Sequence, residues 1–178
     1  MVTLSTERLT LRPPDSTDAA FFVRLMNDPD WLRFIGDRGV RTPADAKAYI
    51  EDKLLASFHQ HGFGLWVVEL RENGKAVGIC GLLKRDTLED VDVGFAFLPE
   101  ARELGYGLEA GRRSLEYAAS ELGLSRVVAI TVPANEASAR LLERLGLSYD
   151  HTMVNESGEE LLVFAIGLSA AATSTWTG

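Results

Sequence analysis

Residues 101–113 read ARELGYGLEAGRR, and this stretch decides the fold because it places two glycines directly before a helical pattern. Gly105 and Gly107 can adopt backbone angles that other residues avoid, so successive N–H groups can converge where the helix begins. The helix dipole also favours an anion at that end. We therefore expect a phosphate-binding turn, with tight packing as the alternative use of the same glycines.

The stretch before this turn, VDVGFAFL at residues 91–98, alternates like a strand. One face carries valine and phenylalanine and is expected to join the core. The other face carries mostly small residues, which lets a ligand approach the strand backbone. Pro99 ends the strand, so we expect a site that runs from the strand to the start of the helix.

A dinucleotide site is the main rival interpretation, since the glycines and Ala110 fit the spacing G-x-G-x-x-A. That motif needs a strand leading straight into the glycines and an acid at the end of the next strand. Residues 99–104 intervene here, and the next strand ends in Val132-Pro133-Ala134-Asn135. We therefore do not expect a nicotinamide or flavin site.

Outward from this stretch, hydrophobic periodicity and turn residues predict helices and strands in mixed order. The expected elements are a strand at 8–12, a helix capped by Asp15 or Ser16 that ends before Asp28, a helix from Thr42 to Phe58, a hairpin around Asn73-Gly74, a strand at 91–98, a helix from 108 to 122, a strand at 126–132, a helix at 135–145 and a strand at 160–166. This order predicts an α/β fold of the α+β type. Its mixed central sheet of about six to seven strands is antiparallel early and locally parallel in the middle, with about four flanking helices.

Length and composition indicate one domain, since the 178 residues are 46% hydrophobic and 25% charged. We assign it to residues 1–168 and expect residues 169–178 to form a flexible tail.

The net charge of -8 argues against general binding to nucleic acids or anionic membranes. The single cysteine, Cys80, excludes an internal disulfide, and the first residues lack a targeting pattern, so we expect a cytoplasmic protein. The histidines show no metal-ligand spacing, so no metal is expected.

Two motifs in order carry a family resemblance: Arg102-x-x-Gly105-x-Gly107 before a helix, and PANEASARLLERLGL at residues 133–147. Together they resemble the GNAT superfamily of N-acetyltransferases, in particular the branch of ribosomal-protein N-terminal (alanine/serine) acetyltransferases. TERLTLRP at 6–13, DP at 28–29, and GLWVVEL followed by GKAVGICGL at 64–82 also resemble that branch. The resemblance thus covers nearly the whole chain.

The resemblance implies acetyl-CoA as cosubstrate, bound between two splayed parallel strands with its pyrophosphate on the glycine turn. The implied cofactor-binding residues are Phe97 and Leu98 beside the pantetheine arm, the turn residues Arg102, Glu103, Leu104, Gly105, Tyr106, Gly107 and Leu108, and Asn135 and Ser138 on the following helix. Glu103 departs from the small or basic residue usual in the family, and its carboxylate is unfavourable beside a pyrophosphate unless it points to solvent or an arginine offsets it.

The chemistry implied is attack by a neutral amine on a thioester, which needs a base for the amine proton and an acid for the thiolate. Asp92 is the candidate base, directly or through water, because it stands where this branch often carries an acid. The tyrosine acid of many members is replaced by Leu142, and Ser138 is the candidate donor to the sulfur. Either residue has a structural alternative: Asp92 as a solvated carboxylate and Ser138 as an ordinary first-turn serine.

We therefore expect an N-acetyltransferase, active as a monomer or homodimer, that acetylates a primary amine of a small molecule or a protein N-terminus. The acidic surface favours a cationic acceptor. Trp31 and Trp66 are candidate residues of the acceptor pocket, with core packing as the alternative. A non-catalytic acyl-CoA-binding or sensing module is the alternative function, because the tyrosine is missing and the turn carries an acid.

Overall fold

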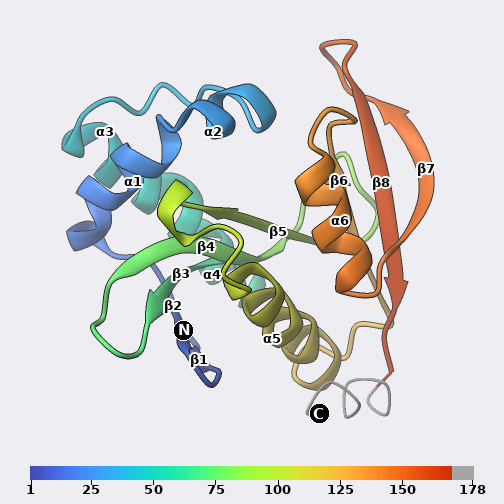
Figure 1. The fold of residues 1–178 in the computed structure, drawn as a ribbon, viewed down its shortest axis with the longest axis horizontal. Helices are drawn as coiled ribbons and strands as arrows, with labels where there is room; N and C mark the ends of the chain where they lie inside the picture. The colour runs from blue at the N-terminus through green and yellow to red at the C-terminus, as the bar shows by residue number, and fades with distance from the viewer. Residues whose placement is uncertain (170–178) are drawn as a thin grey trace.

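One eight-stranded sheet organises the computed structural model, which describes residues 1–169 (Figure 1). Its spatial order is β1-β2-β3-β4-β5-β6-β8-β7. The strands are β1 (Leu4–Ser5), β2 (Leu9–Arg12), β3 (Leu65–Leu70), β4 (Ala76–Leu83), β5 (Asp92–Phe97), β6 (Arg126–Thr131), β7 (Ser148–Val154) and β8 (Glu160–Gly167). All neighbouring pairs are antiparallel except β5 and β6, which are parallel. The predicted mixed α/β sheet is confirmed, with eight strands where six to seven were expected.

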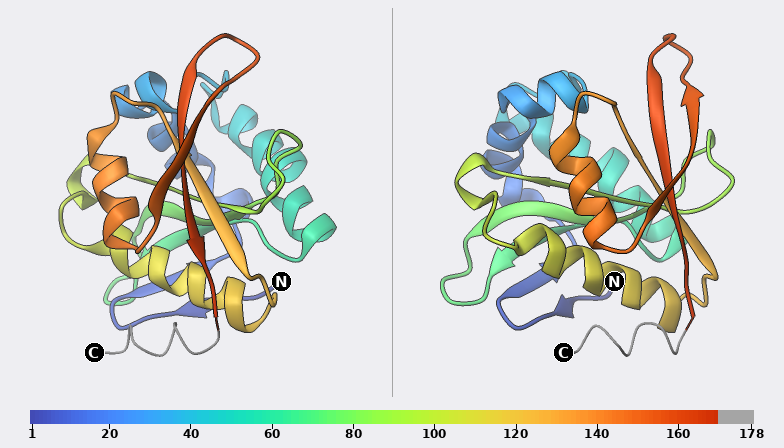
Figure 2. Two further views of the ribbon diagram at one scale, coloured as in Figure 1. Left: turned by 90° about the vertical axis from the view of Figure 1, so that its right-hand side faces the viewer. Right: turned by 45° about the vertical axis from the view of Figure 1, so that its right-hand side comes forward.

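Helices cover both faces of this sheet, as the turned views show (Figure 2). They are α1 (Ala19–Met26), α2 (Pro29–Phe34), α3 (Pro43–Tyr49), α4 (Ala56–His61), α5 (Tyr106–Ser120) and α6 (Glu136–Arg144), with short helical turns η1 (Ser16–Asp18), η2 (Ile50–Leu55) and η3 (Pro99–Ala101). One core cluster joins α1, α2 and α3 to one face of the sheet. A second cluster joins α5 and α6 to the other face.

Local sequence signals explain where several elements begin. Thr42 and Asp45 form a capping box at the start of α3, and Pro43 occupies the first turn. Asp15 caps η1 in the same way and so leads the chain into α1. Gly74 has a φ of 69° in the turn between β3 and β4, which confirms the predicted hairpin.

Three elements were not predicted: β1, α2 and β7. The pair Asp28-Pro29 ends α1 as expected, but it also starts α2, because Asp28 accepts a hydrogen bond from the Asp30 N–H and Pro29 fits the first turn. β7 lies at the edge of the sheet with most side chains exposed, so its sequence lacks the alternation that marks a half-buried strand. Only pairing with β8 makes it a strand.

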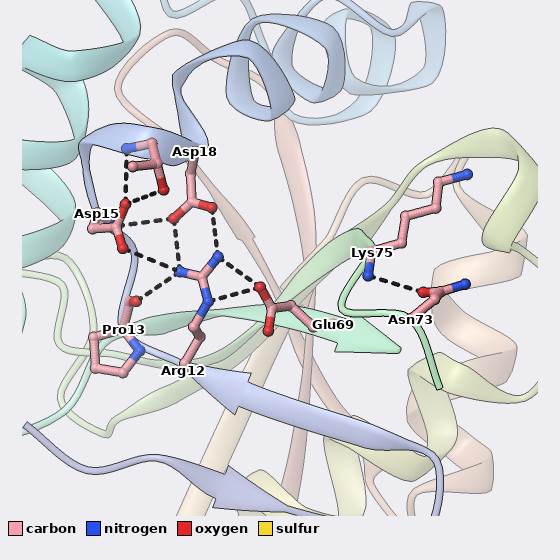
Figure 3. A network of polar contacts seen from close by, with 8 residues as sticks. Arg12, Pro13, Asp15, Asp18, Glu69, Asn73 and Lys75 are labelled. Carbon is pink, nitrogen blue, oxygen red and sulfur yellow. Dashed lines mark hydrogen bonds and ion pairs between the residues drawn. The ribbon is translucent and has the colours of Figure 1, made fainter. Parts of the chain in front are cut away.

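An ionic network fastens the start of α1 to the sheet (Figure 3). The Arg12 guanidinium on β2 lies 2.6 Å from Asp18 and donates to Glu69 on β3 at 2.8 Å. The hydrogen bond with Asp18 is the main cause that raises the pKa of Arg12. Since the Asp18 side chain is only 5% exposed, this contact holds the α1–α2 segment in a defined place over the sheet.

The parallel pair in the centre of the sheet is held together at one end. Within residues 1–169, the β5–β6 register pairs Asp92 with Val128 and goes no further. The Val128 N–H also donates to the Val91 carbonyl at 3.0 Å. The strands therefore diverge toward their carboxyl ends, which exposes backbone groups of β5.

The predicted tail, residues 169–178, lies outside the described residues except for Ser169. Among the helices of the described part, none is long and apolar enough to cross a membrane.

Candidate active site

The diverging end of β5 leaves the backbone N–H of Phe97 without a hydrogen-bond partner among residues 1–169. Leu98 donates its N–H to Val77 and accepts at its carbonyl from Ala101, both at 2.9 Å, so its backbone groups are already used. Consecutive strand residues point their backbone groups to opposite sides. The Phe97 N–H therefore points toward β6, where no ladder partner exists at this position.

The glycine turn, residues 102–107, leads from this strand end into α5. Gly105 is the N-cap of α5 with a φ of 84°, a left-handed conformation that suits glycine. A Cβ on Gly107 would lie 2.8 Å from Leu141 on α6. Gly105 thus provides the turn, whereas Gly107 provides close packing of α5 against α6. The first N–H groups of α5 have no acceptor within the helix and face this turn.

Arg102 does not direct its charge into the turn. Its Nε donates to the Phe97 carbonyl at 3.0 Å, and its terminal nitrogens contact Asp30 at 2.7 Å and Asp28 at 2.5 Å. Asp28 caps α2, and its side chain is only 7% exposed. Arg102 therefore ties the glycine turn to the start of α2, and its charge is balanced by the two aspartates.

Glu103 is exposed and has a φ of 62°, the one non-glycine residue with positive φ in residues 1–169. We expect Glu103→Gly to tighten acetyl-CoA binding roughly 2–5-fold, because it removes a carboxylate near a helix N-terminus. It should also stabilise the fold by about 1 kcal/mol, since glycine adopts this backbone without strain. Calorimetric titration and urea unfolding measure the two effects.

Glu103→Gln is the control for this pair of effects, because it removes the charge and keeps the side chain. It should reproduce the gain in affinity without the gain in stability. Unchanged affinity in both variants would mean that the Glu103 carboxylate points away from the bound anion.

Asn135 and Ser138 lie together where β6 leads into α6. The Asn135 side-chain oxygen accepts from the Ser138 N–H at 3.2 Å and so caps the helix. The Asn135 amide N–H₂ remains available as a donor. The Ser138 hydroxyl has no hydrogen bond to the described residues, and both side chains are half-buried. Leu142, one turn further along α6, is buried in the core.

Asp92 lies at the closed end of the diverging strands and is fully buried. Both of its carboxylate oxygens accept from Arg85 Nε, at 3.0 and 3.1 Å. Burial raises the pKa of Asp92 above its ordinary value of 3.8, and the Arg85 charge opposes that rise. A carboxylate with a raised pKa is better matched to proton transfer near neutral pH than an exposed one. The alternative of a solvated carboxylate is wrong, because no part of the residue reaches the surface.

The two tryptophans do not line an open pocket. Trp66 is fully buried, donates from Nε1 to the Val2 carbonyl at 3.0 Å, and packs edge-on against Phe58 and Tyr117. Trp31 is 6% exposed and donates to the Gly36 carbonyl at 3.0 Å. Core packing, the alternative considered for both residues, therefore describes their positions, because their indoles are enclosed and their N–H groups are satisfied within the chain.

A shallow cleft of about 330 Å³ lies instead at the carboxyl end of β6. It is lined by Arg33, Phe34, Val132, Pro133, Ala134, Glu159 and Glu160. These residues come from α2, from the segment before Asn135 and from the β7–β8 hairpin. No local pattern pointed to this cleft, because its lining meets only when three distant segments pack together.

Two further groups of side chains bear on the site's chemistry. Burial raises the pKa of the Cys80 thiol to about 12, so it is a poor nucleophile at neutral pH. Within residues 1–169, no group of three or more His, Cys, Asp or Glu side chains is arranged to hold a metal ion.

In a comparison with known protein families, residues 8–148 match a model described as "Acetyltransferase (GNAT) domain". This range contains β2 to the start of β7 and therefore the glycine turn, Asp92 and Asn135.

Solved structures of similar fold include an acetyltransferase from Agrobacterium tumefaciens, which is 27% identical with a TM-score of 0.81 and covers 94% of this chain and 95% of its own. A ribosomal-protein-S5-alanine acetyltransferase from Vibrio fischeri is 20% identical with a TM-score of 0.77, covering 94% and 97%. RimJ from Mycobacterium smegmatis, in complex with CoA-disulfide, is 21% identical with a TM-score of 0.77, covering 96% and 89%. At these identities the last two show a shared fold alone.

Proposed function

The chain belongs to the GNAT acetyltransferase family, and on that premise we propose that it transfers the acetyl group of acetyl-CoA to a primary amine directly, in a ternary complex. The observation that carries the proposal is the divergence of β5 from β6 just beyond Asp92 and Val128. The glycine turn lies at the end of one diverging strand and the cleft at the end of the other. In this proposal residues 1–168 form the catalytic domain.

Enzymes of this family use acetyl-CoA, and the residues present suit that cosubstrate. The N–H groups at the start of α5 offer donors to a pyrophosphate, and the left-handed Gly105 lets them converge. The Phe97 N–H is the donor for the pantetheine arm, and the Asn135 amide is a second one. The backbone of Leu98 is not used, because both of its groups are bonded within the chain.

We assign the acceptor to the cleft beside Val132 and Ala134. Glu160, whose side chain has no ion pair among the described residues, and Glu159 give the cleft an excess of negative charge over Arg33. Such a cleft attracts a cationic acceptor. The Vibrio fischeri structure is named for acetylation of a ribosomal-protein alanine, so a protein N-terminus and a small cationic amine are both to be tested.

The bound cosubstrate supplies an activated thioester, and residues of this chain would supply proton transfer and orientation. In this proposal Asp92 takes up the proton of the attacking amine through water, because its carboxylate is fully buried and cannot touch the amine itself, and burial raises its pKa toward that role. Backbone N–H groups on the side of β5 that faces β6, beyond the single pair of Asp92 with Val128, stabilise the oxyanion that forms on the carbonyl. The Ser138 hydroxyl donates a hydrogen bond to the departing sulfur. Cys80 does not act as a covalent nucleophile, because it is buried and burial raises the pKa of its thiol to about 12.

Isothermal titration of the protein with acetyl-CoA tests the proposal, with CoA and NADH as comparison ligands. We expect saturable binding of acetyl-CoA and CoA and none of NADH. An amine panel then follows: a peptide with an N-terminal alanine, a polyamine and a free amino acid, with released thiol measured by a chromogenic reagent. The buried Cys80 does not interfere with that readout.

The possible outcomes separate the alternatives. Binding with turnover of any amine supports the transferase. Binding without turnover on the whole panel favours an acyl-CoA-sensing module. Absence of acetyl-CoA binding would overturn the proposed function, because the glycine turn would then serve packing alone.

A further inference from the structure

Arg8 lies in the turn between β1 and β2, and its side chain reaches across to the glycine turn. The terminal nitrogen Nη1 donates to the Leu104 carbonyl at 3.0 Å. The guanidinium carbon lies 4.6 Å from the centre of the Tyr106 ring, within range of a cation–π contact. Its Nη2 lies 3.1 Å from the place where a Cβ on Gly105 would stand. One guanidinium thus contacts Leu104 and Tyr106 and lies beside Gly105 between them.

A carboxylate on α5 holds Arg8 in that place. Glu109 accepts from Arg8 Nε at 2.7 Å, from the Arg8 backbone N–H at 2.8 Å, and from the Thr6 hydroxyl at 2.5 Å. Burial raises the pKa of Glu109, but the hydrogen bonds from Thr6 and Arg8 outweigh it, and the pKa is lowered overall. Glu109 lies in the first turn of α5, so these contacts direct its negative charge toward the β1–β2 hairpin.

The contact with Leu104 has a consequence for the neighbouring peptide group. In a trans peptide the carbonyl and the following N–H point in opposite directions. Because Arg8 holds the Leu104 carbonyl on its own side, the Gly105 N–H points to the other side. Gly105 has no side chain to restrain it, and no side-chain bond caps α5 there.

We propose that Arg8 is a positioning residue for the pyrophosphate-binding turn, fixing its N–H groups toward the coenzyme through the contacts with Leu104, Tyr106 and Glu109. This inference rests on the proposed function, since it assumes that acetyl-CoA binds at the glycine turn. Arg8 acts through the turn and not on the coenzyme itself. A lysine at this position keeps the charge but cannot make the Leu104 and Glu109 contacts at once, because its single ammonium lacks the planar fork of arginine.

The test compares two acetyl carriers on wild type and Arg8→Lys. Acetyl-CoA has the pyrophosphate, and acetyl-pantetheine lacks it. We expect Arg8→Lys to weaken acetyl-CoA binding roughly tenfold or more, as for the loss of a hydrogen bond to a charged group, and to leave acetyl-pantetheine binding unchanged. Titration calorimetry measures the first ligand, and one-dimensional NMR titration measures the weaker second one.

Arg71→Gln is the matched control. Arg71 donates to the carbonyls of Thr6 and Glu7 at 2.9 and 3.2 Å, so it supports the same β1–β2 turn without a hydrogen bond to residues 102–107. It should bind acetyl-CoA like wild type. The double variant Arg8→Gln/Glu109→Gln removes both charges of the pair. If Arg8 positions the turn, this variant should still bind acetyl-CoA weakly.

Four outcomes would overturn the inference while leaving the proposed function intact: wild-type affinity in Arg8→Lys, equal losses for both ligands, an equal loss in Arg71→Gln, or restored affinity in the double variant. Each would mean that Arg8 contributes only charge or general stability. If wild type itself fails to bind acetyl-CoA, the proposed function fails first and the inference with it.

Discussion

Asp92→Asn is expected to lower kcat by about 10²–10⁴-fold, the usual contribution of a general base, while acetyl-CoA affinity stays unchanged. Asparagine keeps the shape of the side chain and can still accept from Arg85, but it cannot take up a proton from an amine. The comparison uses steady-state kinetics on an amine identified in the panel, with calorimetric titration of acetyl-CoA on the same preparations.

The same substitution should not destabilise the protein at neutral pH. Because burial raises the pKa of Asp92 in the native state, the native state holds this proton more tightly than the unfolded chain. Its stabilising contribution is therefore present at low pH and is lost as pH rises above the ordinary value of 3.8. Asparagine behaves like the protonated form, so urea unfolding should show equal or greater stability in the variant at pH 7.

Asp90→Asn is the matched control, since Asp90 is a half-exposed carboxylate two residues earlier that pairs with Arg126 at 3.1 Å. We expect wild-type kcat from it. An unchanged kcat in Asp92→Asn would exclude the base role. A marked loss of stability at pH 7 would instead show that the ion pair with Arg85 outweighs the cost of burial.

Trp66→Ala is expected to destabilise the protein by about 3–5 kcal/mol, a large share of the total stability of a domain. The indole is fully buried, and its removal leaves a cavity between Phe58 and Tyr117 and an unpaired carbonyl at Val2. Trp66→Phe should cost less, because it restores most of the ring. Urea unfolding followed by far-UV circular dichroism measures both.

The comparison residue is Tyr149, an aromatic that is 58% exposed on the edge strand β7. Tyr149→Ala should change the free energy of unfolding by only about 0.5 kcal/mol. If Trp66→Ala were as mild as this and raised the KM for the amine instead, Trp66 would belong to the acceptor site and the core assignment would be wrong.

Much of the fold follows from local patterns along the chain. Thr42, Pro43 and Asp45 predict the start of α3, and Asn73-Gly74 predicts the hairpin, both as found. The glycine turn predicts the helix α5, which begins at Tyr106, two residues before the expected Leu108. These signals work because caps, turns and helix starts depend on residues within one or two turns of each other. β7 was not predicted, because it is a strand only through its pairing with β8.

In the candidate site too, some residues could be identified from the local sequence and others only from the tertiary structure. The sequence alone determined the turn and the strand that leads to it, because each is a local motif with its own spacing, whereas the base role of Asp92 came from the family resemblance and stays a prediction. Tertiary structure alone decided that Arg102 pairs with Asp28, that Arg85 covers Asp92, that Trp66 is buried, and that Arg8 supports the glycine turn. Arg102 and Arg8 meet partners many tens of residues away, and Trp66 is enclosed by equally distant segments. No period or motif encodes such contacts, since they exist only after the sheet has formed and the helices have packed onto it.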